Sequence, residues 1–380
     1  MSTVFRLRVL NVCYFSLFAL FLSFLPVYGS GIGISDTQLG LLLSAGSLIS
    51  LVSQPSWGVV SDRFRTILKV LLPLMAAGTA AGALLYQSEQ AWSYALGVGL
   101  MYVFFLPTDP LMESLNYQTS QRLGVPFGSI RMFGALGYAI ASLAAGYASD
   151  LWGMHSLSWV FAGCGIAAVL LGLTVPDVRT SAKAPAFRQL FAFFGQSRAW
   201  TFLLLVLVVA VAHKMNDLFL GLRIERLGGS MRLTGTAWFV MTIAETLFFA
   251  LSSRWVKLGR EGAVMTLAAA MYAVRFLLCG FVSSPYALAA LQAMQGVTFV
   301  LFYVGGIQYI HAIAPAQWRS TGQTAFTSVF FGVSGIVGSA LGGWLMDEYG
   351  GAALYYTMAG IAAAGCLLFR MFLFPRGRQA

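Results

Sequence analysis

The sequence predicts an all-α integral membrane protein with twelve transmembrane helices in two six-helix bundles, related by a pseudo-two-fold axis. Three observations support this fold class: an apolar composition, a succession of apolar runs of about 20 residues, and motifs that recur at about half the chain length. Of the 380 residues, 58% are hydrophobic and 9% are charged, and the mean hydropathy is +0.78. Soluble domains carry about 25% charged residues, so this composition excludes a soluble protein.

The apolar runs set the number of spans. Each run is long enough to cross a hydrocarbon core of ~30 Å at a helical rise of ~1.5 Å per residue. The runs do not alternate with a period of two, which argues against the strands of a membrane β-barrel. We expect spans at residues 7–28, 37–61, 67–86, 91–115, 127–148, 156–175, 199–222, 233–254, 262–281, 285–310, 321–346 and 353–374.

The basic residues support this count and give an orientation. The net charge of +10 would suggest a nucleic-acid partner only if these residues clustered on a soluble face, but they lie between apolar runs. With the N-terminus inside, most Lys and Arg residues fall in inner segments, as the positive-inside rule requires. These are Arg6, Arg8, Arg63, Arg65, Lys69, Arg122, Arg179, Lys183, Arg188, Arg198, Arg254, Lys257, Arg260, Arg319, Arg370, Arg376 and Arg378. We therefore expect a multi-pass protein of the inner (plasma) membrane, with both termini cytoplasmic.

Three arginines depart from this rule. Arg223, Arg226 and Arg232 fall in an outer loop after the seventh span. They are expected either at the mouth of a cavity or among the lipid headgroups, and the headgroup position is favoured because it needs no partner.

The longest polar segment divides the chain into a bundle over residues 1–175, a cytoplasmic linker over 176–198 and a second bundle over 199–380. Internal similarity agrees with this division. Gly146–Gly153 and Gly343–Gly350 both read G-x-x-x-D-x-x-G, and they end the fifth and the eleventh span. Two parallel six-helix halves with a site between them are typical of secondary transporters.

Charged residues inside the spans locate the candidate site. A charge at the bilayer centre costs roughly 2.5–3.5 kcal/mol on insertion scales, so such groups normally face a cavity and a partner. Glu113 and Arg131 lie on consecutive spans and are expected to pair at a solute site. Asp109 lies between Pro107 and Pro110, where it is expected either as a ligand or at a helix cap or kink.

The seventh span carries a second polar group. Lys214 and Asp217 lie three residues apart on one helix face. They are expected either to neutralise each other or to line the cavity, together with His213 and Asn216.

Motifs for other chemistry are missing from the sequence. It contains no phosphate-binding loop, dinucleotide fingerprint or nucleophile elbow, and its Cys and His residues show no metal-site spacing. An enzyme, a cofactor and a metal are therefore not expected. A channel is not expected either, because no pore loop or ring of like charges is present.

The loop after the second span resembles the major facilitator superfamily. Gly58-Val-Val-Ser-Asp62-Arg63-Phe-Arg65 … Lys69 is similar to its signature G-x-x-x-D-R-x-x-R/G-R/K, although Phe64-Arg65 stands where the family usually has a glycine. The resemblance implies that Asp62, Arg63 and Arg65 gate the inner side. The alternative is an ordinary basic inner loop.

A narrower resemblance covers the fourth and fifth spans. Gly128-Ser-Ile-Arg131-Met-Phe-Gly134-Ala-Leu-Gly137-Tyr138 is similar to the sugar-binding stretch of the lactose permease group of oligosaccharide–proton symporters. That group also has a glutamate eighteen residues before the arginine, where Glu113 stands here, and an aromatic residue seven after it, here Tyr138. The resemblance implies that Glu113 and Arg131 hold sugar hydroxyls and that Tyr138 stacks on the ring. Phenylpropionate and nucleoside permeases are near alternatives.

The resemblance continues through the second half, with departures. It implies that Glu245 serves both substrate binding and proton coupling and that Arg275 assists proton release. On the tenth span the group has a lysine, a histidine and a proton-carrying glutamate. Gln292, Gln295 and Thr298 replace them here, and only Gln295 is retained as a substrate-binding candidate. The proton site is therefore expected elsewhere, at Asp109, Glu113, Asp217 or Glu245, and galactoside specificity is in doubt.

These observations predict a proton-coupled symporter of a small polar solute, a sugar or glycoside, that works by alternating access. The expected partners are the solute, the proton and the lipid bilayer, and one chain is expected to act as a monomer. The first alternative is a proton-driven efflux antiporter of amphipathic compounds. The second is a transport-inactive membrane receptor or sensor of the same fold.

Overall fold

The computed structural model describes residues 2–178, 197–251, 259–314 and 319–373. Within these ranges the chain is helical throughout, apart from short connections, and contains no strand. Eleven helical stretches are long and apolar enough to cross a membrane, and Ser156–Gly172 is a shorter apolar helix. They occupy the twelve predicted positions, so the predicted all-α membrane fold is confirmed. Most of the predicted linker lies outside the described residues, as do Arg179, Lys183, Arg188, Arg254, Lys257, Arg376 and Arg378.

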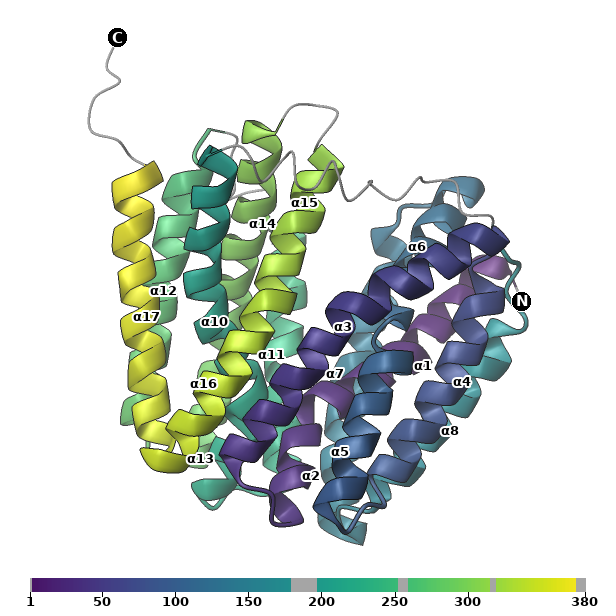
Figure 1. Ribbon diagram of the computed structural model, residues 1–380, viewed down its shortest axis with the longest axis horizontal. Helices are drawn as coiled ribbons and strands as arrows, with labels where there is room; N and C mark the ends of the chain where they lie inside the picture. The colour runs from purple at the N-terminus through teal and green to yellow at the C-terminus, as the bar shows by residue number, and fades with distance from the viewer. Residues whose placement is uncertain (1, 179–196, 252–258, 315–318, 374–380) are drawn as a thin grey trace.

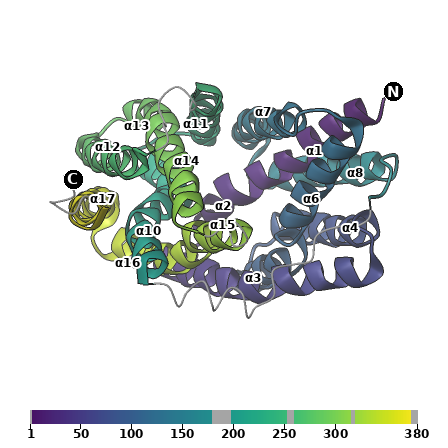
Figure 2. The ribbon, with the colours of Figure 1, turned by 90° about the horizontal axis from the view of Figure 1, so that it is seen from above.

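The first six spans form one group of helices on one side of the molecule, and the last six form the other (Figure 2). The first group contains α1 (Thr3–Ser23), α2 (Leu25–Gly31), α3 (Asp36–Phe64), α4 (Leu68–Leu85), α5 (Ala91–Leu100), the π-helical segment η1 (Met101–Phe105), α6 (Thr108–Leu123), α7 (Gly128–Trp152) and α8 (Ser156–Gly172). The second contains α10 (Ser197–Arg226), α11 (Met231–Leu251), α12 (Glu261–Phe281), α13 (Pro285–Leu291), η3 (Gln292–Met294), α14 (Gln295–Ile313), α15 (Arg319–Thr327), η5 (Ser328–Val333), α16 (Ser334–Glu348) and α17 (Gly350–Leu373). We call the side where α8 ends and α10 begins the linker side, at the top of Figure 1, and the other the far side.

Two spans are interrupted at corresponding places in the two halves. The fourth span passes from α5 through η1 to α6, and Pro107 follows the π-helical segment. The tenth passes from α13 through the short 3₁₀ segment η3 to α14. Such segments often mark functional sites because they reorient side chains in mid-helix. Interruptions in corresponding spans indicate a site between the halves.

Small residues join the halves toward the far side. The main cross-half helix pairs are α3 with α16 and α7 with α11, and α1 and α2 also contact α10. Gly40 lies against the backbone of Ser339 and Gly343, and Gly235 lies against the backbone of Ser142, so a Cβ at either glycine would overlap main-chain atoms. Small residues permit this close approach where lipid supplies no hydrophobic drive between helices.

Polar contacts reinforce the same side. Asp36 at the start of α3 is 1% exposed and forms an ion pair with Arg226 at the end of α10. The Thr37 hydroxyl donates to Asp347 Oδ2 at 2.8 Å, again across the halves. The guanidinium of Arg232 lies 4.4 Å from the ring centroid of Tyr147 on α7.

These contacts change the interpretation of the three outer arginines. Arg226 and Arg232 contact the other half, and Arg223 lies against Gly351 within its own half. Arg226 and Arg232 therefore have protein partners across the halves, which the headgroup position did not require. Their partners are distant in sequence, so the charge pattern alone could not pair them.

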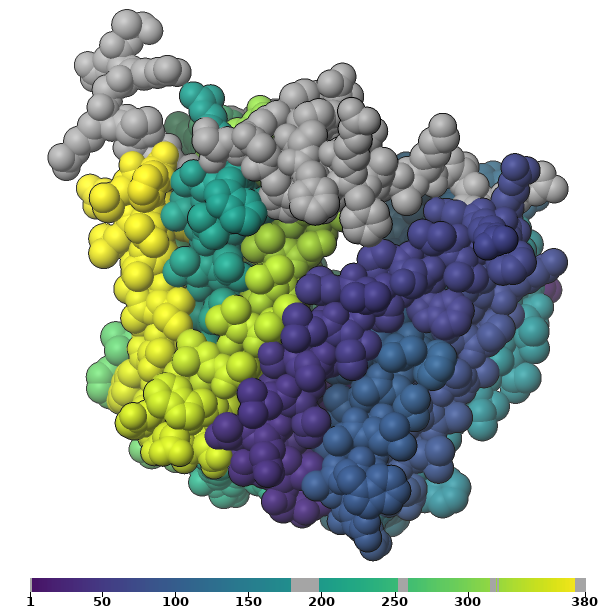
Figure 3. Space-filling view, viewed as in Figure 1, coloured from purple at the N-terminus to yellow at the C-terminus, as the bar shows by residue number. Residues whose placement is uncertain are grey.

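The halves separate toward the linker side. Figure 3 shows α3 and α16 in contact over the lower part of the molecule and diverging above it. Asp62, Arg63 and Arg65 lie at the linker-side end of α3, where Arg65 ends the helix with φ of 50°. Among the described residues, none of these three side chains forms an ion pair. The described conformation is closed on the far side and open on the linker side.

Candidate functional site

The predicted pair of Glu113 and Arg131 is present between α6 and α7. Arg131 Nε donates to Glu113 Oε1 at 2.5 Å. The side chain of Arg131 is 36% exposed, and that of Glu113 is 32% exposed. The charges of both residues act on the hydroxyl of Tyr303 on α14, so the exposed pair faces the space between the halves. The guanidinium carbon of Arg131 lies 3.9 Å from the ring centroid of Phe15 on α1, which fixes its orientation.

The pair keeps unused hydrogen-bonding capacity. Among the described residues, Glu113 Oε2 is buried without a hydrogen-bond partner. Arg131 uses only Nε toward Glu113, so its two terminal amino groups remain available as donors. The pair therefore offers a fork of donors to a molecule in the opening, and Glu113 keeps one carboxylate oxygen that no protein group uses among the described residues.

Asp109 lies one turn before Glu113 on α6 and faces the same region. Its charge, like those of Glu113 and Arg131, acts on the hydroxyl of Tyr303, which comes from α14 in the other half. The neighbouring Thr108 is held by the Tyr14 hydroxyl at 2.8 Å. The segment after η1 therefore points two carboxyl groups toward the space between the halves.

Two aromatic rings meet on the far side of this region. Tyr138 of α7 and Trp238 of α11 have ring centroids 5.9 Å apart, across the halves. Tyr138 is seven residues after Arg131, and Trp238 is seven before Glu245, so each ring shares a helix face with a charged residue. The Tyr138 hydroxyl bonds to Ser23 at 3.1 Å, whereas the buried indole N–H of Trp238 has no partner among the described residues. Each half thus contributes one charge and one ring.

Arg275 is fully buried in the second half, in surroundings that the sequence did not predict. Its terminal amino groups donate to Gln295 Oε1 and Gln292 Oε1, each at 2.5 Å, and Nη1 also lies 3.4 Å from Thr298 Oγ1. The three residues that replace titratable groups of the lactose permease group therefore hold Arg275. The alternative of a buried Glu245–Arg275 ion pair is not found among the described residues.

Asp217 is the centre of a second cluster. Its carboxylate lies 3.5 Å from Lys214 Nζ, 3.4 Å from His213 Nε2 and 3.4 Å from Gln295 Nε2. The predicted contact between Lys214 and Asp217 is thus present, and Gln295 links this cluster to Arg275. His213 is buried, and its Nδ1 lies 3.0 Å from the Tyr272 hydroxyl. Asp217 is accordingly a well-partnered carboxylate.

Glu245 differs from Asp217 because it has no ion pair among the described residues. It is half-buried on α11, and the charges of Asp217, Arg275 and Lys214 act on it. The region as a whole contains the carboxyl groups of Asp109, Glu113, Asp217 and Glu245 and the cationic groups of Arg131, Lys214 and Arg275. Carboxyl groups outnumber cations by one, and Glu245 and Asp109 are the two carboxyl groups of the region without an ion pair among the described residues.

Sequence reasoning missed the part played by Gln292 and Thr298, which it noted only as departures from a family pattern. A buried arginine needs several acceptors, so polar residues one turn apart on a neighbouring span were the available signal. Within the described ranges, no group of three or more His, Cys, Asp or Glu is arranged to hold a metal ion.

Comparison with known proteins gives a consistent result. The profile described as "MFS_1 like family" matches residues 4–357. The chain is 26% identical to the maltose permease of Geobacillus stearothermophilus, with 99% of this chain and 96% of that protein covered. It is also 26% identical to the probable 3-phenylpropionic acid transporter of Escherichia coli, with 96% and 95% covered. The crystal structure of the nucleoside transporter NupG superposes with a TM-score of 0.87 at 17% identity, covering 99% and 100%, which shows a common fold.

Proposed function

Because the chain belongs to the MFS_1 like family of major facilitator transporters, we propose that this multi-pass membrane transporter carries a small uncharged polar solute, a sugar or glycoside, in symport with protons. Like its relatives, the chain is a secondary transporter; it is not an enzyme. One observation carries the proposal on the solute: the Glu113–Arg131 pair retains two donor groups on Arg131 and one carboxylate oxygen that no protein group uses among the described residues.

The chemistry of this pair suits hydroxyl groups. A carboxylate accepts from a hydroxyl, and a guanidinium donates in a planar fork. Tyr138 and Trp238 would cover the apolar C–H face of a sugar ring from the far side. The maltose permease among the relatives agrees with this chemistry.

The balance of charge favours an uncharged solute. Since carboxyl groups outnumber cations in the region, an anion would meet excess negative charge there unless the carboxyl groups were protonated. This argument disfavours a carboxylate substrate such as the one named for the 3-phenylpropionic acid relative. A nucleoside is the second candidate, because Tyr138 and Trp238 place two rings where a base could stack, 5.9 Å apart.

Glu245 is the proposed proton carrier. It lacks an ion pair among the described residues, whereas Asp217 has three donors around it. A carboxyl group with weak compensation changes its protonation when a solute or a conformational change alters its surroundings. The membrane potential supplies about 2.3 kcal/mol per charge per ~100 mV, so one proton could concentrate a neutral solute roughly forty-fold.

The difference between the two sides of the interface supports alternating access. The far side is held closed by Asp36 with Arg226 and by Thr37 with Asp347. The basic residues favour the linker side as cytoplasmic, which makes the described state inward-open with both termini inside. Asp62, Arg63 and Arg65 would then act when the inner side closes. Both parts of the site come from one chain, so a monomer suffices.

Counterflow in proteoliposomes tests the proposal. Liposomes loaded with maltose, uridine or 3-phenylpropionate are diluted into trace labelled solute, and the exchange is followed. We expect exchange with the neutral hydroxylated solutes and little with the acid. Exchange of the acid alone would contradict the solute class. The panel is then extended to other sugars, nucleosides and aromatic acids. If no compound exchanges, the proposal of solute uptake is wrong and export becomes the leading alternative.

A further inference from the structure

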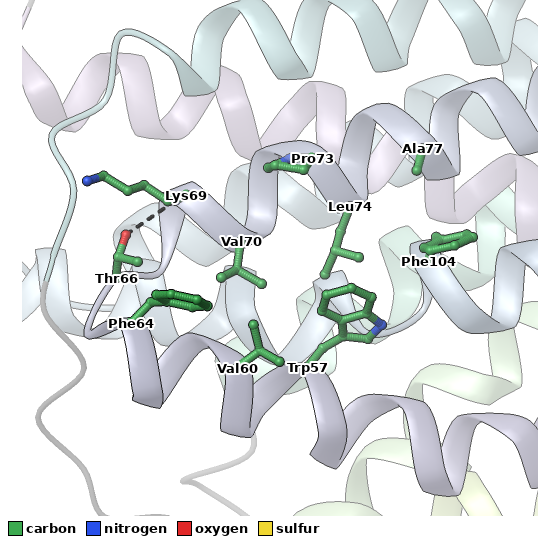
Figure 4. A pocket seen from close by; sticks show the side chains of 10 residues that line it. All are labelled: Trp57, Val60, Phe64, Thr66, Lys69, Val70, Pro73, Leu74, Ala77 and Phe104. Atoms are coloured by element: carbon green, nitrogen blue, oxygen red, sulfur yellow. Dashed lines mark hydrogen bonds between the residues drawn. The ribbon is translucent and has the colours of Figure 1, made fainter.

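A groove between α3 and α4 lies outside the region of Glu113 and Arg131. Its cavity volume is about 540 Å³, and apolar side chains of α3, α4 and η1 line it, among them Trp57, Leu74 and Phe104 (Figure 4). Only Thr66 and Lys69 among the lining residues are polar. Neither belongs to the proposed solute site, so the groove requires a separate explanation.

The groove faces the bilayer. α4 packs mainly on α5, η1 and α8 of its own half, and Pro73 in its second turn is exposed. Phe64, at one end of the groove, is 68% exposed. Lys69 and Ala77, at opposite ends of the groove along α4, are eight residues apart, which corresponds to about 12 Å of helix. An elongated apolar groove of this kind suits an acyl chain.

A cation stands at the linker-side end of the groove. Lys69 is exposed, and among the described residues its amine forms no ion pair. The first N–H groups of α4 are already occupied, because Asp177 Oδ1 accepts from Ile67 N at 3.2 Å and from Leu68 N at 3.0 Å. An anion here would therefore bind through the Lys69 side chain and not through the helix N-terminus.

Pro73 adds an acceptor at the same end. A proline has no N–H, so the carbonyl oxygen of Lys69, one turn earlier, lacks its helical donor. This end of the groove thus has a cationic side chain and a backbone carbonyl without its helical hydrogen bond. A phosphate bearing a hydroxylated headgroup matches this arrangement.

We propose that the groove binds an anionic phospholipid, with one acyl chain between α3 and α4 and its phosphate on Lys69. Basic sites between transmembrane helices at the cytoplasmic surface favour anionic headgroups, and one lysine near the membrane surface contributes about a fivefold preference. The lipid would lie against the last turn of α3, which carries Asp62 and Arg63. The proposal is independent of which solute the protein carries.

Native mass spectrometry of the full-length purified protein tests this site. The protein is titrated with phosphatidylglycerol and with phosphatidylcholine of the same acyl chains, and bound lipid is counted on the intact mass. We expect Lys69→Gln to lower the affinity for phosphatidylglycerol about fivefold and to leave phosphatidylcholine unchanged. Arg122→Gln, which removes an exposed charge at the linker-side end of α6, is the matched control and should change neither.

A second variant tests the acyl-chain part. Ala77→Phe fills the groove and should weaken binding of both lipids. If the variant still gives the charge-state distribution of the folded protein, the loss of lipid is not due to misfolding. An unchanged ratio of the two lipids in Lys69→Gln would overturn the proposal. Equal losses in Lys69→Gln and Arg122→Gln would show diffuse surface attraction, and full competition by millimolar inorganic phosphate would show a phosphate site without a lipid. Either result would also overturn it.

Discussion

Arg131 and Arg275 are both arginines within membrane-spanning helices, but their surroundings differ. Arg131 is 36% exposed, is paired with a carboxylate and keeps two donor groups free. Arg275 is fully buried, and neutral side-chain oxygens occupy both of its terminal amino groups. The same residue type therefore serves two purposes: the first arginine is available to a ligand, and the second supplies a fixed positive charge beside the carboxyl groups of the second half.

The largest expected effect concerns Glu245, the carboxyl group on which the fixed charge of Arg275 acts. Glu245→Gln should abolish uphill uptake, a loss of the roughly forty-fold accumulation that one proton can drive at ~100 mV, while counterflow persists. The physical reason is that an amide preserves the shape of the side chain but cannot carry the proton. Uptake and counterflow are measured in the same proteoliposomes. Asp217→Asn is the comparison, and loss of proton-driven uptake in it alone would move the proton site to Asp217.

Removal of Arg275 should lower the stability of the protein and not its affinity for the solute. Arg275→Leu leaves Gln295 Oε1 buried without its donor and leaves Gln292 Oε1 only the longer bond from Asn216 Nδ2 at 3.3 Å, which should reduce the free energy of unfolding by about 2–3 kcal/mol. Denaturant titration in mixed micelles measures this change. Arg370→Leu, a substitution in the last turn of α17, serves as the control. Wild-type stability together with lost solute binding would show that Arg275 is a solute ligand.

The far side provides a smaller effect. Arg226→Gln removes the cross-half ion pair with Asp36, a partly exposed contact that we expect to contribute about 1 kcal/mol. The population of outward-open protein should therefore rise about fivefold, which can be followed by alkylation of a cysteine introduced at Ser142, a residue buried where α7 meets Gly235 of the other half. Arg223→Gln, which removes an arginine whose partner lies within its own half, should leave the labelling rate unchanged. Equal rates in the two variants would contradict a bridging role for Arg226.

The smallest expected effect concerns the second ring. Trp238→Phe keeps an aromatic surface but removes an indole N–H that has no partner among the described residues. We expect solute affinity to fall about two- to fivefold, equivalent to one modest hydrogen bond, with stability unchanged. Trp344→Phe, on an exposed position of α16, is the control for loss of a tryptophan. An unchanged affinity would exclude Trp238 from the solute site.

Part of this arrangement was predictable from the sequence. The apolar runs gave the twelve spans, and the cost of charges in the membrane predicted the Glu113–Arg131 pair, because each residue needed a partner and they lie on consecutive spans. The surroundings of Arg275 were not predictable in this way. Neutral amides carry no charge signal, so Gln292 and Gln295 could not be assigned to a buried arginine.

Contacts across the halves could not be predicted from the sequence, for a different reason. Asp36 and Arg226 are separated by half the length of the chain, and their pairing depends on how the two bundles close on the far side. The interruption at η5 was also unexpected, because Ser328–Val333 contains no proline, whereas Pro107 follows η1. Local signals therefore gave the spans, and tertiary packing decided the partners.

The most direct test of the central claim is solute binding to the two arginine variants in parallel. The solute that exchanges in counterflow is titrated against purified Arg131→Lys and Arg275→Lys, with folding verified by thermal unfolding. We expect Arg131→Lys to lose at least about tenfold in affinity, because a lysine cannot reproduce the forked donor toward the solute and Glu113. Arg275→Lys should bind with near wild-type affinity wherever it remains folded. Full affinity in Arg131→Lys with loss in folded Arg275→Lys would contradict the assignment of the solute to the Glu113–Arg131 pair.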